Sequence, residues 1–136
     1  MIFRVAVLQM RPVNREYENN IKTIIKYMSE AKQEGADILL LPECFITGYD
    51  LTIDNDSAMT EGDLSPLCEQ AGKLGIGLVA TALSKGERHP QNAAFVIGKD
   101  GKILMKYATL PNPHSSEISK IFLSVFSSIS IALYIL

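Results

Sequence analysis

Three apolar runs, separated by segments of helical periodicity, constrain the fold of this 136-residue chain more than any other feature. They occupy residues 4–10, 36–42 and 76–83. An apolar run that is continuous rather than alternating is typical of a strand buried on both faces. Strands that alternate with helices belong to largely parallel sheets with right-handed crossovers. The sequence therefore predicts an α/β fold with a mixed, mostly parallel sheet.

Two amphipathic helices and a hairpin complete the predicted pattern. Apolar side chains recur at helical spacing over residues 17–31, with Asn14 as the expected N-cap and Gly35 as the C-terminal cap. A second helix is expected over residues 63–74. Further on, Asp100-Gly101 lies between two apolar runs, which is a strong signal for a β-hairpin. Ligands of such sheets gather at the carboxyl ends of the parallel strands.

Composition and charge argue against several classes of function. With 13 Lys+Arg and 15 Asp+Glu the formal net charge is −2, and no basic stripe marks a nucleic-acid binder. Two cysteines cannot build a disulfide scaffold and the first residues lack a secretory signal, so the cytoplasm is the expected compartment. The uncharged stretch over residues 121–136 is shorter than the roughly 20 residues of a membrane-spanning helix, so no membrane anchor is expected. No cofactor or metal is predicted.

Glu43 is the candidate catalytic residue, because it directly follows the second predicted strand at the edge where ligands gather. A carboxylate at the mouth of an apolar strand is poorly solvated, and desolvation disfavours its charged form. Such a group suits a general base that takes up a proton near neutral pH. A structural role, in which Glu43 caps a helix or pairs with a surface lysine, stays open at this point.

Three segments in order carry a resemblance to a known family. Residues 35–49 contain the run Leu-Pro-Glu-x-Phe-x-x-Gly-Tyr; residues 5–10 precede it and the hairpin over residues 92–107 follows it. Together they closely resemble the N-terminal part of the carbon–nitrogen hydrolase (nitrilase/amidase) domain. The resemblance implies an α-β-β-α sandwich, here incomplete, with helices on one face of the sheet.

The resemblance also implies a reaction, the hydrolysis of a non-peptide C–N bond in a small-molecule amide or nitrile. The family uses a glutamate as general base, a lysine that stabilises the oxyanion and a cysteine nucleophile that forms a covalent intermediate. Glu43 corresponds to the family's glutamate. The substrate class expected for a complete domain is therefore a small amide or nitrile.

The lysine and the cysteine of the family do not carry over. The family's Tyr-x-Lys-x-His-Leu corresponds here to Tyr-Ala-Thr-Leu-Pro over residues 107–111, which lacks both the lysine and the histidine. Lys106, just before that tyrosine, is a candidate substitute. Cys44 is expected in an extended segment, where its side chain would point away from that of Glu43. Cys68 is expected on the apolar face of the second helix as a small core residue.

The resemblance stops near residue 110. We therefore expect residues 1–110 to form the N-terminal portion of a carbon–nitrogen hydrolase domain and residues 111–136 to be a divergent apolar tail that is not native to the family. With Glu43 alone retained, the chain is expected to be inactive as it stands. The alternative is a non-catalytic remnant or a partner-binding half-domain. A homo-oligomer would cover the sheet face that an incomplete sandwich leaves bare.

Overall fold

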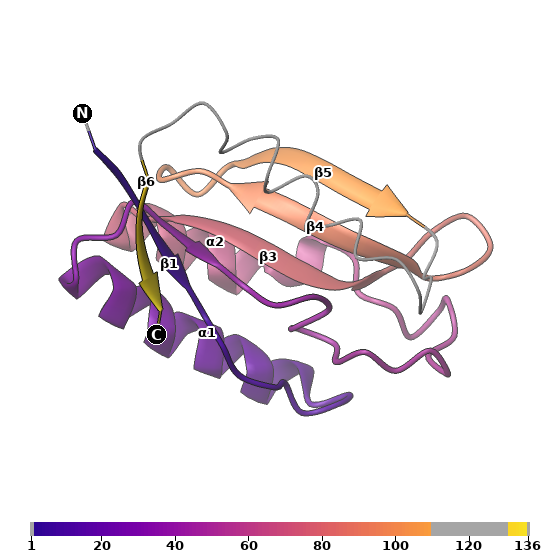
Figure 1. The fold of residues 1–136 in the computed structure, drawn as a ribbon. Helices are drawn as coiled ribbons and strands as arrows, with labels where there is room; N and C mark the ends of the chain where they lie inside the picture. The colour runs from indigo at the N-terminus through magenta and orange to yellow at the C-terminus, as the bar shows by residue number, and fades with distance from the viewer. Residues whose placement is uncertain (1, 110–130, 136) are drawn as a thin grey trace.

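A computed structural model describes residues 2–109 and 131–135 of the chain. The described strands form one mixed sheet in the order β5-β4-β3-β2-β1-β6 (Figure 1). The strands are β1 (Phe3–Val7), β2 (Ile38–Leu40), β3 (Gly77–Ser84), β4 (Gln91–Ile97), β5 (Ile103–Thr109) and β6 (Ile131–Ile135). The helices are α1 (Tyr17–Gln33), the 3₁₀ helix η1 (Glu61–Leu64) and α2 (Ser65–Leu74). The predicted α/β fold with a mixed sheet is confirmed.

The centre of the sheet is parallel and one side of it is antiparallel. Val5 of β1 lies opposite Ile38 of β2, which in turn lies opposite Gly77 of β3, and both pairings are parallel. β4 runs antiparallel to both of its neighbours, β3 and β5, and the predicted Asp-Gly turn closes at Gly101 with a left-handed φ of 80°. The carboxyl ends of β1, β2 and β3 therefore meet at the edge where β4 begins and β5 ends.

Both long helices cover the same face of the sheet, as predicted (Figure 1). Apolar side chains from α1, α2 and the strands form the main core; among them are Ile24, Met28, Leu39, Leu67, Ala71, Leu78 and Phe95. Side chains on the opposite face of the strands form a second cluster around Val5, Ile38, Val79 and Ala94. The central strands are thus buried on both faces, which explains why their sequences do not alternate.

The start of α1 differs from the prediction. Asn14 is not its N-cap: the N-cap position belongs to Glu16, whose side chain makes no capping hydrogen bond. Asn14 lies instead against Gly48, and a Cβ built on Gly48 would come within 2.7 Å of the Asn14 Cα atom. The next residue, Arg15, donates its backbone N–H to the carbonyl of Thr47 at 2.9 Å. The entry to α1 is therefore held by the loop after β2 and not by a cap.

The end of α2 follows the prediction, whereas α1 has Glu34 as its C-cap and the predicted Gly35 is the next residue. α1 ends at Gln33, and Gly35 follows with a left-handed φ of 80°. α2 ends at Leu74, and Gly75 is its C-cap with a φ of 64°. Glycine is favoured at both positions because it adopts positive φ without the strain of a Cβ atom.

The C-terminal residues add a strand to the sheet. β6 pairs in parallel with β1, with Ile131 opposite Phe3. Residues 110–130 and 136 lie outside the described part of the chain, so the division between residues 1–110 and a divergent tail stays a prediction. Within the described residues, no helix combines the length and the apolar character that crossing a membrane requires.

Replacing Gly48 by alanine is expected to destabilise the protein by roughly 2–3 kcal/mol. The φ of 75° strains any L side chain, and the new Cβ would press on the backbone of Asn14. Urea unfolding followed by circular dichroism measures the change. Gly62→Ala is the matched control, because Gly62 is exposed and the nearest atom to its Cβ position is 3.7 Å away. Equal stability losses in the two variants would contradict the close approach of Asn14.

Candidate active site

Glu43 opens the turn over residues 43–47, which follows β2 at the carboxyl edge of the parallel strands. This turn is tied to the neighbouring strand β3 through one buried threonine. The Thr81 hydroxyl accepts a hydrogen bond from the Phe45 N–H at 3.0 Å and donates one to the carbonyl of Pro42. The backbone carbonyl of Thr81 also accepts the Ile46 N–H at 2.9 Å. The position of Glu43 therefore depends on β3.

Two further buried side chains hold the same turn. The Thr47 hydroxyl accepts the N–H of Leu83 at 2.9 Å, which extends the attachment along β3. Asn20 of α1 donates to the Ile46 carbonyl at 3.0 Å and to the Val13 carbonyl at 2.7 Å. Buried backbone groups need such partners, because an unpaired one costs about 1–3 kcal/mol. The turn is thus held from both the sheet and the first helix.

Asn92, at the start of β4, is the residue that contacts the Glu43 carboxylate. Its Nδ2 atom donates a hydrogen bond to Oε1 of Glu43, and its Oδ1 atom lies 3.4 Å from the Sγ atom of Cys44. Asn92 is 3% exposed, whereas Glu43 is an exposed residue. Among the described residues nothing buries the Glu43 side chain, so the prediction that it is poorly solvated is wrong. Sequence reasoning overlooked Asn92, although a polar residue that opens an apolar strand is itself a signal.

Cys44 departs from its predicted geometry. It lies in a turn with a left-handed φ of 52°, not in an extended segment, and its side chain reaches the same asparagine as Glu43 does. Burial, together with the neighbouring charge of Glu43, raises the pKa of the Cys44 thiol far above its ordinary value. The thiol stays protonated at neutral pH, and a protonated thiol is a poor nucleophile. Cys68 packs against the core from α2, and burial raises its pKa as well.

Lys106 lies on the other face of the sheet from the Glu43 contact. It pairs in register with Phe95, and its Nζ atom lies 5.4 Å from the centroid of the Phe95 ring. Asn92 pairs instead with Thr109. Cross-strand partners share a face, and residues an odd number of positions apart along a strand point to opposite faces. The prediction that Lys106 takes the place of the missing catalytic lysine is therefore wrong. Thr109, two residues after Tyr107, occupies the position of the lysine in the family's Tyr-x-Lys motif.

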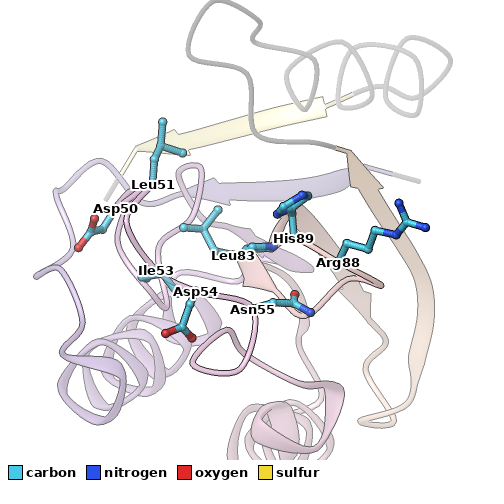
Figure 2. Close-up of a pocket in the computed structure, with 9 residues that line it drawn as sticks. Asp50, Leu51, Ile53, Asp54, Asn55, Leu83, Arg88 and His89 are labelled. Carbon is cyan, nitrogen blue, oxygen red and sulfur yellow. The ribbon is translucent and has the colours of Figure 1, made fainter.

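A pocket of about 420 Å³ adjoins this edge of the sheet (Figure 2). Its lining combines apolar, acidic and basic side chains from β3 and two loops: Asp50, Leu51, Ile53, Asp54, Asn55, Leu83, Arg88, His89 and Pro90. Leu83 connects the pocket to the Glu43 turn, because it packs in one cluster with Cys44 and pairs in register with Asn92. The pocket thus lies beside the Asn92–Glu43 contact without including it.

The charges at the pocket are partly compensated. Asp50 accepts hydrogen bonds from the hydroxyl and the N–H of Thr52 and pairs with Arg15 at 2.7 Å, and together these contacts lower its pKa to about 2. Arg88 and His89 are exposed and lie across the pocket from Asp50 (Figure 2). Within the described residues, no group of three or more His, Cys, Asp or Glu side chains is arranged to hold a metal ion.

Comparison with known proteins identifies the family. Residues 4–113 match the profile of the carbon–nitrogen hydrolase family, and the chain belongs to this family. A nitrilase from Pyrococcus abyssi is 31% identical over 106 residues, which are 74% of this chain and 40% of that protein. An omega-amidase of Xenopus laevis is 31% identical over 108 residues, which are 77% of this chain and 39% of that protein. The chain thus spans about two fifths of the length of these relatives.

Solved structures support the fold. The crystal structure of an amidase from Nesterenkonia sp. superposes with a TM-score of 0.66 at 24% sequence identity. The match covers 80% of this chain and 44% of the amidase. Together with the sequence relatives, this similarity confirms the predicted nitrilase-like fold class.

Removing the Thr81 hydroxyl is expected to loosen the turn that carries Glu43. Thr81→Val preserves shape but leaves the Phe45 N–H and the Pro42 carbonyl without their partner, at an expected cost of about 2–3 kcal/mol. Chemical unfolding gives the stability change, and amide hydrogen exchange at Phe45 localises it. Thr23→Val is the control, because the Thr23 hydroxyl bonds only the Asn19 carbonyl at the surface of α1. Unchanged exchange at Phe45 in Thr81→Val would contradict this role.

Proposed function

We propose that this chain carries the general-base part of a carbon–nitrogen hydrolase active site, with Glu43 as the base. The observation that supports the proposal best is the hydrogen bond from buried Asn92 to the Glu43 carboxylate. It holds the carboxylate at the carboxyl edge of the parallel strands, where α/β sheets bind their ligands. The match of residues 4–113 to the family supports the same role.

The chemistry proposed for Glu43 is proton acceptance. In a complete site, Glu43 takes the proton of a cysteine thiol, and the thiolate attacks the carbonyl or nitrile carbon of the substrate. Water then resolves the covalent intermediate. Cys44 does not fit the nucleophile's role, because its buried thiol is held protonated, and Cys68 belongs to the core packing of α2. Thr109 cannot supply the positive charge that the family's lysine places near the oxyanion.

The proposed substrates of the complete site are small amides or nitriles. Relatives named nitrilase and omega-amidase support this class. Residues 1–136 alone are proposed to lack hydrolase activity, because the described residues bring neither a reactive thiol nor an ammonium group to Glu43. The two cysteines are free thiols, which is consistent with the proposed cytoplasmic location.

An activity assay tests this proposal. The purified chain, incubated with a panel of small aliphatic amides and nitriles, is expected to release ammonia no faster than its Glu43→Gln variant. Ammonia is measured with a coupled enzymatic assay, and Cys44→Ala and Cys68→Ala are assayed beside it. Turnover that depends on Glu43 but survives both cysteine substitutions would contradict the proposed mechanism. Turnover lost in either cysteine variant would identify a nucleophile that we exclude.

A second proposal, a partner-binding half-domain, is favoured by the surface of the edge strand β5. Leu104 and Met105 are large apolar residues there, 65% and 52% exposed. An edge strand with exposed apolar side chains favours association with another chain, including a second copy. Light scattering coupled to size exclusion is expected to show a dimer or larger species that Leu104→Lys weakens. A monomer at every concentration would contradict self-association, and Val13→Lys controls for the added charge.

A further inference from the structure

Cys44, Asn92 and Glu43 form one chain of hydrogen bonds that links a thiol, an amide and a carboxylate. We propose that Cys44 and Asn92 are positioning residues: the Cys44 thiol sets the orientation of the Asn92 amide, and the amide in turn holds one oxygen of Glu43. This inference rests on the proposed role of Glu43 as a base. It assigns Cys44 a function that needs no reactivity.

Donor and acceptor chemistry allows one arrangement of this chain. An ionised carboxylate only accepts hydrogen bonds, so the group facing Glu43 must be the NH₂ of Asn92. That orientation turns Oδ1 of Asn92 toward Cys44, where an acceptor requires a donor. A protonated thiol supplies one, and the raised pKa of Cys44 keeps its proton in place. A flipped amide would set its oxygen against the carboxylate, which removes that bond, and would leave only a weak N–H···S contact with Cys44.

Because both residues are buried, the Cys44 thiol is the donor available to the Asn92 carbonyl oxygen. Cys44 is fully buried and Asn92 is 3% exposed, so bulk water is poorly placed to replace the thiol as the donor to Oδ1. The left-handed turn at Cys44 brings its side chain to Asn92 although it adjoins Glu43 in sequence. In an extended segment the two neighbouring side chains would point to opposite faces. The strained backbone thus enables both side chains to meet one amide.

We propose that the two carboxylate oxygens of Glu43 have different roles. Oε1 accepts the Asn92 hydrogen bond, whereas no described residue donates a hydrogen bond to Oε2. A base needs one oxygen that can accept the incoming proton and benefits from a fixed direction for it. The Cys44–Asn92 pair provides that direction for an otherwise exposed side chain.

NMR of the Asn92 side-chain amide tests the inference without any catalytic assay. In the ¹⁵N-labelled chain, the two Nδ2 protons of Asn92 should give separate, slowly exchanging resonances. Cys44→Ser retains an O–H donor and should preserve this signature. Cys44→Ala removes the donor, so the Nδ2 protons should exchange about tenfold faster, as loss of a buried hydrogen bond implies. Cys68→Ser and Cys68→Ala should both behave like the unsubstituted chain.

The serine variant separates positioning from packing. If Cys44 only fills space, serine and alanine will change the Asn92 resonances alike, and the inference is overturned. Should Cys44→Ala fail to fold, Glu43→Ala provides the second measurement. Glu43 is exposed, so this variant should fold, and it should shift the bonded Nδ2 proton upfield while the rest of β4 keeps its resonances. An unchanged Nδ2 proton would overturn the Asn92–Glu43 contact. Neither result depends on amide hydrolysis, so the proposed function is tested separately.

Discussion

The hydrogen bonds that satisfy the backbone of the turn after β2 are the constraint on which the site depends. This turn leaves the sheet, so its N–H and carbonyl groups fall outside the regular strand ladder, although the Ile46 N–H still bonds the Thr81 carbonyl of β3. Thr81 and Thr47 connect it to β3, and Asn20 connects it to α1. Because buried polar groups are costly when unpaired, the turn adopts one conformation once the helix and the sheet are packed. Glu43 inherits its position from that conformation.

The alternation of side chains along β4 and β5 decides which residues can join Glu43. Phe95 and Lys106 share the face that packs against the helices, whereas Asn92 and Thr109 share the face of the Glu43 contact. A shift by one residue along a strand moves a side chain to the other face of the sheet. For this reason Lys106, although close to the family's lysine position in sequence, cannot serve at the site.

In the proposed site, the two positioning residues are buried and the proposed base is exposed. Cys44 and Asn92 are buried, and their polar atoms are paired with each other and with the carboxylate. Glu43 lies at the surface of the described residues, next to a pocket whose Leu83 wall contacts the same cluster. Rigid support beneath an accessible carboxylate suits the proton acceptance that we propose for Glu43.

The sequence by itself determined strands β1 to β5, both helices with the glycines that follow them, and the place of Glu43 after a buried strand, but not β6. These features follow from local periodicity and from the backbone freedom of residues such as Gly35 and Gly75. The tertiary structure alone decided the partner of Glu43, since Asn92 is 49 positions away along the chain. It also turned Cys44 toward that asparagine. Contacts between distant segments depend on how the sheet and the helices pack. The periodicity of apolar residues along the sequence does not encode that packing.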